Sequence, residues 1–224
     1  MKKLSAAKTV RQTSFFGTIY YYERKRAMNI TVYCGALPGG DPEFTKRAYE
    51  LGAWMAENGH RLVYGAGNAG MMGAISDGVT DRGGETIGVT PEFFVFAEAT
   101  REDLTEVILS EDMSVRRKTM IEMGDAFIAL PGGMGTLDEI SEVITYKRLS
   151  LLGKVNKPIM LYNVNGFYDN FFRLLDDMTD QGFCRRVDRD NVIEVRCIED
   201  IEKALREAGR EDTTANILDE KKKG

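Results

Sequence analysis

A glycine-rich loop between a buried strand and a helix is the stretch of this sequence best suited to chemistry. Residues 131–136 read Pro-Gly-Gly-Met-Gly-Thr and follow the apolar run 126–130, which is typical of a strand buried on both faces. A helical pattern opens directly after the loop. Backbone N–H groups in such a loop, together with the helix dipole, bind anions. The candidate anion-binding residues are therefore Gly132, Gly133, Met134, Gly135 and Thr136.

Glu139 stands three residues after Thr136, and two interpretations of this pair are open. The spacing is that of a capping box, in which the threonine closes on a backbone amide and the glutamate reaches back to the N-cap. Next to a Gly-Gly-x-Gly loop, however, the Thr136 hydroxyl faces the ligand, and Glu139 in the first turn lies within its reach. Glu139 is then a catalytic carboxylate, and the cap describes the ligand-free protein.

Arg116 is a charged residue on an otherwise apolar helical stripe. In the helix predicted over 112–123, Met113, Arg116, Met120 and Met123 share one face. A buried charge needs a partner, since an unpaired one is unfavourable by several kcal/mol. The alternative is a side chain that snorkels to solvent. The neighbouring Arg117 is expected by default on a solvated face.

The elements that position these residues alternate between strand and helix. This predicts an α/β fold: a single-domain Rossmann-like, mostly parallel sheet with helices on both faces. Ligands bind such sheets at the carboxyl ends of strands, so the glycine-rich loops 35–40, 65–70 and 131–135 should share one edge. The predicted strands are 30–34, 61–64, 86–90, 104–109, 126–130, 158–162 and 192–195, and the predicted helices are 41–59, 71–81, 112–123, 136–152, 167–178 and 198–208.

The loop 65–70 matches the dinucleotide fingerprint Gly-x-Gly-x-x-Gly, with Glu85 near the distance expected for a ribose-binding acid. That fingerprint belongs after the first strand of its unit, whereas a strand and a helix precede it here. A tight turn for close helix packing explains the glycines equally well. Gly67 remains a candidate nucleotide contact under either interpretation, and a dinucleotide oxidoreductase is one rival function.

Composition narrows the chemistry further. The net charge of −5 gives no attraction to nucleic acid polymers or anionic membranes, and no apolar run approaches the roughly 20 residues of a spanning helix. Three widely spaced cysteines favour a reducing, cytoplasmic setting. The sole histidine, His60, is expected in a surface turn, which disfavours a Ser-His-Asp triad or a histidine metal site. No Walker lysine follows the loop, which disfavours phosphoryl transfer from a nucleoside triphosphate. Neither a metal nor a cofactor is expected.

Three regions are expected along the chain. Residues 1–27 hold seven Lys or Arg and one Glu, and we expect a basic extension that is poorly ordered. Residues 28–209 form the Rossmann-like, nucleotide-binding catalytic domain. Residues 210–224 are charged without periodicity, and we expect a frayed tail.

The motif Pro-Gly-Gly-Met-Gly-Thr-Leu-Asp-Glu at 131–139 resembles the PGGxGTxxE signature of the Lonely Guy family, the cytokinin-activating nucleoside 5′-monophosphate phosphoribohydrolases once labelled possible lysine decarboxylase. The resemblance runs from Ile30 to about Phe183 and includes VYCGALPG, LVYGAGNAGMMG and MSVRRKTM. The chain departs from the family pattern at Ala36, Ala66, Ser114, Met134 and Tyr146. None of these departures removes a catalytic group.

The resemblance implies roles for individual residues. Arg116 and Glu139 fall on the family's catalytic arginine and glutamate, while Gly133, Gly135 and Thr136 fall on its phosphate-binding loop. It further implies substrate contacts at three positions, which are Arg117, Glu98 and Thr145. The implied reaction is hydrolysis of the N-glycosidic bond of a purine nucleoside 5′-monophosphate, with a cytokinin as one candidate product. The implied assembly is a homodimer.

Two other functions remain open beside hydrolysis. The same fold serves as a non-catalytic nucleotide or cofactor carrier, although an Arg116–Glu139 pair argues for catalysis. The old decarboxylase label implies a pyridoxal-phosphate Schiff-base lysine, and the sequence offers no convincing candidate.

Overall fold

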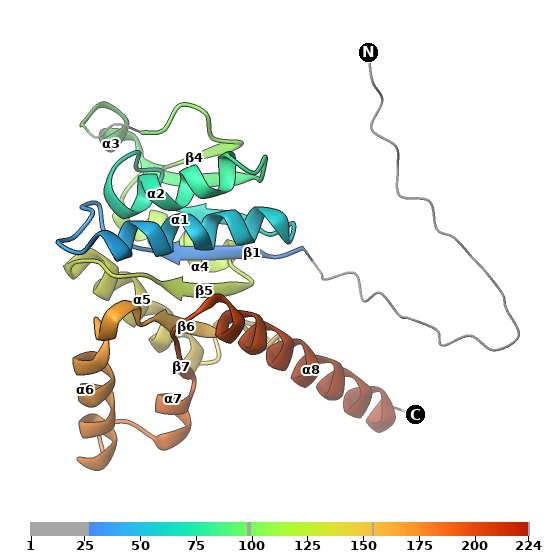
Figure 1. Cartoon of the computed structure of the whole chain (residues 1–224). Coiled ribbons are helices and arrows are strands. Elements are labelled where there is room, and N and C mark those ends of the chain that lie inside the picture. The colour runs from blue at the N-terminus through green and yellow to red at the C-terminus, as the bar shows by residue number, and fades with distance from the viewer. Residues whose placement is uncertain (1–26, 98–99, 154, 224) are drawn as a thin grey trace, which may run out of the picture.

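The computed structural model of the chain describes residues 27–97, 100–153 and 155–223 (Figure 1). Its strands are β1 (Asn29–Tyr33), β2 (Arg61–Tyr64), β3 (Thr86–Pro91), β4 (Glu106–Ser110), β5 (Ala126–Ala129), β6 (Ile159–Tyr162) and β7 (Val192–Val195). They form one seven-stranded sheet in the order β4-β3-β2-β1-β5-β6-β7, and every neighbouring pair is parallel. The predicted α/β class and the parallel sheet are confirmed.

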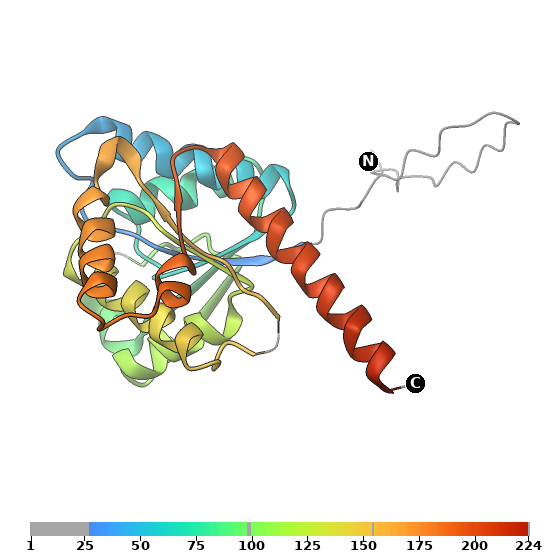
Figure 2. The same ribbon diagram turned by 90° about the horizontal axis from the view of Figure 1, so that it is seen from below.

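The helices cover both faces of this sheet, as Figure 2 shows. Their bounds are α1 (Pro42–Glu57), α2 (Gly70–Thr80), α3 (Glu92–Ala97), α4 (Met113–Met123), α5 (Met134–Arg148), η1 (Val164–Gly166), α6 (Asp169–Asp180), α7 (Arg186–Asp190) and α8 (Ile198–Lys223). Side chains of α1, α2 and α8 pack in one core cluster, and those of α4, α5 and α6 in the other. None of the helices in the described ranges is long and apolar enough to cross a membrane.

The central strands supply both clusters because successive side chains of a strand point to opposite faces. In β1, Ile30 and Val32 lie in the cluster with α1 and α2, whereas Tyr33 lies in the cluster with α4 and α5. All four residues of β5 are buried, as the apolar run at 126–130 predicts. This two-sided burial holds the carboxyl ends of β1 and β5 rigidly side by side.

The chain order reverses between β1 and β5. From β1 the strands β2, β3 and β4 are added on one side, and β5, β6 and β7 on the other. The loops that leave β1 and β5 are joined, since the Gly35 N–H donates to the Pro131 carbonyl at 3.2 Å. Such a switch point is where open α/β sheets bind ligands. The glycine loop is thus placed at the expected edge.

Several elements differ from the sequence prediction. α3 and α7 were not expected, because each is short and lacks an apolar periodicity of its own. α5 begins at Met134 rather than Thr136, and β4 begins at Glu106 rather than 104. α8 continues to Lys223, where a frayed tail was expected, and its end projects away from the sheet (Figures 1 and 2). Residues 210–223 contain neither glycine nor proline, the two residues least favourable in a helix, so the helix can continue through them. The basic extension at 1–27 lies outside the described residues, apart from Ala27.

Candidate active site

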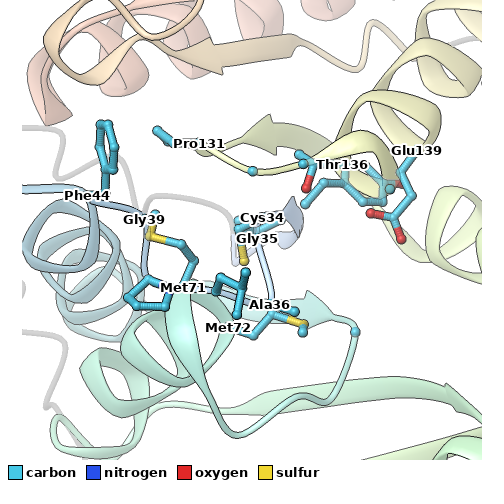
Figure 3. A pocket seen from close by; sticks show the side chains of 18 of the residues that line it. Cys34, Gly35, Ala36, Gly39, Phe44, Met71, Met72, Pro131, Thr136 and Glu139 are labelled. Atoms are coloured by element: carbon cyan, nitrogen blue, oxygen red, sulfur yellow. The ribbon is translucent and has the colours of Figure 1, made fainter. Parts of the chain in front are cut away.

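A cavity of about 480 Å³ opens at the switch point, between the loops that follow β1, β2 and β5. Figure 3 shows Thr136 and Glu139 on one side of it and Phe44 on the other. Besides Phe44, the large apolar side chains that line the cavity are Met71, Met72, Phe94, Met113, Met120 and Phe167. The cavity therefore has a polar end beside α5 and a larger apolar end, a division suited to an amphipathic small molecule.

Arg116 and Glu139 form the polar end. Arg116 Nη1 lies 3.0 Å from Glu139 Oε1, and both side chains are 12% exposed. Arg116 Nε also donates to the Val89 carbonyl at 3.0 Å, at the end of β3. The prediction that Arg116 requires a partner is confirmed, and the partner comes from the next helix along the chain. The pair lines the cavity rather than being sealed in the core.

Gly65, at the end of β2, makes room for the Arg116 side chain. A Cβ on this residue would overlap Arg116 Nη2 and approach the Met72 sulfur at 3.1 Å. The absence of a side chain here lets the guanidinium lie against the backbone and reach Glu139. Gly65 therefore determines where the cation lies.

We expect Gly65→Ala to lower kcat/KM for a hydrolysed substrate by roughly tenfold to a hundredfold, because the methyl group displaces the guanidinium by about 1 Å. Steady-state kinetics with a check of thermal unfolding measures this. Gly209→Ala is the matched control, since an added Cβ there meets open space and α8 lies on the far side of the fold. Wild-type kinetics for Gly65→Ala would contradict this role.

Burial sets the protonation behaviour of Glu139. It raises the pKa of the carboxyl above its ordinary value, and the charge and hydrogen bond of Arg116 offset this only in part. The cation lowers the pKa, but the net shift is upward. An upward shift is typical of carboxylates that exchange protons during catalysis.

The glycine loop presents an open helix N-terminus to the cavity. Gly133 is the N-cap of α5, no side chain caps it, and the first turn holds no acidic residue. Gly133 and Gly135 face open space at their Cβ positions and line the cavity. Gly132 packs on the Thr136 hydroxyl and on the Gly35 N–H, which rules out a side chain there. Free amides and a helix dipole together favour an anion at this point.

The capping-box interpretation of Thr136 and Glu139 is wrong. Thr136 lies inside the first turn of α5, two residues after its first residue Met134, and therefore cannot be the N-cap. The loop is fixed to the β1 loop, so the backbone turns into the helix immediately after Gly133. Thr136 is buried against Gly132, and Glu139 bonds Arg116 instead of reaching back.

Four other predicted contacts lie outside the cavity wall. Met134 is 81% exposed, and Thr145 is exposed with its hydroxyl on the Ser141 carbonyl. Arg117 was expected on a solvated face, but it is largely buried and pairs with Glu142 at 2.8 Å. Gly67 is covered by the Met72 side chain, which favours the tight-packing interpretation of its loop. Glu98 lies outside the described residues.

The prediction that His60 lies in a surface turn is wrong. It is 4% exposed and packs on the Trp54 ring at 5.3 Å, rather than lying in a surface turn. It precedes β2, and so lies at the sheet edge opposite the cavity. The described residues contain no group of three or more His, Cys, Asp or Glu arranged to hold a metal ion.

Several residues of the cavity were missed by sequence reasoning. Phe44 and Phe167 meet edge to face, with ring centroids 5.7 Å apart, and close the apolar end. Tyr33 and Cys34 lie beneath the polar end, and burial followed by the charge of Glu139 raises the pKa of both. The available signal was position, because Cys34 and Phe167 follow strands that end at the ligand-binding edge.

The chain matches one protein-family model and several named proteins. A family whose model is described as "Possible lysine decarboxylase" matches residues 72–207. A protein of Rhodococcoides fascians named cytokinin riboside 5′-monophosphate phosphoribohydrolase is 38% identical over 84% of this chain and 94% of its own length. Relatives of the same name from Oryza sativa subsp. japonica and Arabidopsis thaliana are 44% and 35% identical, covering 71% and 83% of this chain. The match spans 65% of the rice protein and 85% of the Arabidopsis protein.

Solved structures agree on the fold. A molybdenum cofactor binding protein of Rippkaea orientalis superposes with a TM-score of 0.59 at 23% identity, over 82% of this chain and 98% of that one. The molybdenum cofactor carrier protein of Chlamydomonas reinhardtii gives 0.60 at 20% identity, over 83% and 98%. At these identities the likeness concerns the fold alone. The family match, the sequence relatives and the PGGxGTxxE motif show that the chain belongs to the Lonely Guy family, whose model carries the possible lysine decarboxylase description.

Proposed function

We propose that this protein hydrolyses the N-glycosidic bond of a purine nucleoside 5′-monophosphate, releasing the free base and ribose 5-phosphate. The observation that carries the proposal is the Arg116–Glu139 pair, 3.0 Å apart in a cavity that also receives the uncapped N-terminus of α5. The names of the sequence relatives support the same reaction and extend the substrate class to cytokinin riboside monophosphates.

The phosphate would bind the amides of Gly133 and Gly135, with Thr136 beside them. Its binding energy fixes the sugar so that C1′ stands before Glu139. The C1′–N bond breaks, the ring gains oxocarbenium character, and Glu139 stabilises that charge or removes a proton from the attacking water. The water oxygen bonds to C1′, and the base leaves with a proton. Arg116 holds Glu139 in position and contributes positive charge towards the phosphosugar.

The pH dependence of the reaction follows from the raised pKa of Glu139. If the ionised carboxylate is the active form, kcat/KM rises with pH through a midpoint above the ordinary carboxyl value. A pH–rate profile between about pH 4 and 9 measures that midpoint. Glu139→Gln should remove this rising limb from whatever activity remains. A midpoint at or below the ordinary carboxyl pKa would contradict the assignment.

Base release is the direct test. The protein is incubated with AMP, GMP, CMP, UMP and an N6-isopentenyl-AMP, and the free bases are separated by chromatography. We expect release from purine monophosphates and none from the matching nucleosides, because they lack the group that the α5 N-terminus binds. Tight nucleotide binding without base release would instead support a carrier. An absorption band of bound pyridoxal phosphate in the purified protein would support the decarboxylase.

The assembly and compartment belong to the same proposal. Val115 on α4 and Met134 at the start of α5 are exposed apolar residues near the cavity, and a homodimer of this family would cover such a surface. Light scattering on a sizing column distinguishes monomer from dimer. Cys34, Cys184 and Cys197 are free thiols, which supports a reducing compartment such as the cytoplasm.

A further inference from the structure

A buried tyrosine outside the cavity wall holds the base of the glycine loop. The Tyr168 hydroxyl donates to the Leu130 carbonyl at 2.7 Å, across a sequence separation of 38 residues. Leu130 is the residue before Pro131, where β5 gives way to the loop. Tyr168 is 2% exposed and Leu130 is fully buried, so water has little access to compete for this bond.

Two backbone hydrogen bonds also hold the loop at this point. The Leu130 N–H donates to the Tyr33 carbonyl at 2.9 Å, and the Pro131 carbonyl accepts from Gly35 at 3.2 Å. Both of these bonds connect the loop to β1. Among the residues that the structure describes, the Tyr168 bond is the one hydrogen bond that connects Leu130 to the other side of the fold, at the start of α6. Without it, a buried carbonyl next to a proline would lose its hydrogen bond.

Tyr168 is itself fixed by a polar array that runs from the buried Asn163 to the exposed carboxylates of Asp169 and Glu194. Its backbone N–H donates to Asn163 Oδ1 at 2.7 Å, and Asn163 Nδ2 donates to Asp169 at 2.7 Å and Glu194 at 2.8 Å. Asn163 is 2% exposed and follows β6, while Glu194 belongs to β7. These hydrogen bonds connect the Tyr168 backbone to β6 and β7 through Asn163 and Glu194. The two strands therefore fix the place from which the Tyr168 side chain reaches Leu130.

The ring of Tyr168 also supports the apolar end of the cavity. It meets Phe167 edge to face, with centroids 5.0 Å apart, and Phe167 lines the cavity against Phe44. Burial raises the pKa of the Tyr168 hydroxyl above its ordinary value, so it stays a donor throughout the working pH range. One side chain thus contacts both the loop that would bind phosphate and the wall opposite it.

We propose that Tyr168 is a positioning residue for the phosphate-binding loop, setting through the Leu130 carbonyl where the Gly133 and Gly135 amides lie relative to Glu139. This rests on the proposed function, in which those amides hold the substrate phosphate. No atom of Tyr168 needs to touch the substrate. Its effect is on phosphate affinity rather than on the bond-breaking step.

The test is Tyr168→Phe, which keeps the ring packing and removes only the hydroxyl. We expect KM for AMP and the dissociation constant of ribose 5-phosphate, measured by calorimetry, to rise together by about tenfold, because a loop released from this bond must be ordered again when the phosphate binds. We expect kcat to change by less than about threefold. Tyr64→Phe is the matched control, since Tyr64 is equally buried at the end of β2 and lies outside the cavity wall.

A second variant keeps the test decisive if the phenylalanine protein is unstable. Para-aminophenylalanine incorporated at position 168 retains an N–H donor in place of the hydroxyl, and it should restore ribose 5-phosphate affinity to within about threefold of wild type. If Tyr168→Phe fails to fold, the amino variant decides alone: ribose 5-phosphate affinity about tenfold or more below wild type in the folded amino variant, despite its retained donor, would overturn the proposal.

The outcomes separate this inference from the proposed function. If wild type releases no base but binds ribose 5-phosphate, the reaction is wrong and the binding data still decide the role of Tyr168. Equal ribose 5-phosphate affinity in wild type and Tyr168→Phe overturns the positioning role, whatever the reaction is. Wild-type protein that neither releases base nor binds ribose 5-phosphate overturns both.

Discussion

Glu139→Gln is expected to abolish most base release while leaving nucleotide binding intact. Glutamine has nearly the same shape, and its amide oxygen still accepts from Arg116 Nη1, so the cavity keeps its form. What is lost is the negative charge that stabilises C1′ or deprotonates water. We expect kcat for AMP to fall by about 10²–10⁴-fold, which is roughly 3–5 kcal/mol of barrier. The dissociation constant for AMP should stay within about threefold.

The matched control for this variant is Glu142→Gln. Glu142 lies one turn further along α5, is 29% exposed and pairs with Arg117, outside the cavity. Losing one carboxylate charge at position 142 should leave kcat for AMP within about twofold of the wild-type value. Release of adenine at the wild-type rate by Glu139→Gln would remove Glu139 from the mechanism, and a comparable loss in both variants would point to a general charge effect.

Arg116→Ala should have the second largest effect. The substitution leaves Glu139, with only 12% of its side chain exposed, without the cation that lowers its pKa. The carboxyl then holds its proton to higher pH, so the rising limb of the pH–rate profile moves upward. We expect kcat/KM at neutral pH to fall by about 10²–10³-fold, with part of the loss recovered at alkaline pH as Glu139 ionises.

Three measurements separate this effect from unfolding or loss of net charge. Removing one partner of a buried pair destabilises a fold by roughly 3–5 kcal/mol, so chemical denaturation should confirm that Arg116→Ala stays folded under assay conditions. Arg116→Lys keeps the charge, but an ammonium group cannot reproduce the two guanidinium hydrogen bonds to Val89 and Glu139. Its kcat/KM should lie between those of wild type and Arg116→Ala. Lys118→Ala removes an exposed cation from the same helix and should be neutral. An unchanged rising limb in Arg116→Ala would refute the coupling between the two residues.

Local patterns in the sequence were sufficient to predict the buried strand, the parallel sheet and the need for a partner of Arg116. The apolar run at 126–130 predicts a buried strand because only a strand of a doubly covered sheet tolerates apolar residues on both faces, and all of β5 is buried. The alternation of elements predicts a parallel sheet because parallel strands require a crossover helix between them. An arginine on an apolar stripe predicts a charged partner because a bare buried charge is too unfavourable to persist.

The sequence alone did not show which residues far apart in the chain are in contact. Spacing alone left Glu139 either in a capping box or as a carboxylate that faces the ligand. The structure rules out the capping box, because α5 starts two residues before Thr136, and it pairs Glu139 with Arg116. His60 shows the same limit, since burial against Trp54 depends on how α1 packs rather than on the turn before it.

What the sequence by itself determined is a strand, a glycine loop and a helix, together with one arginine on an apolar stripe for which it predicts a partner. These follow from interactions within a few residues and from the periodicity of burial. Only the tertiary structure decided that Arg116 fits beside Gly65 to meet Glu139 and that Tyr168 reaches back to Leu130. Those contacts join segments 23 to 51 residues apart, and only the order of strands in the sheet brings such segments together.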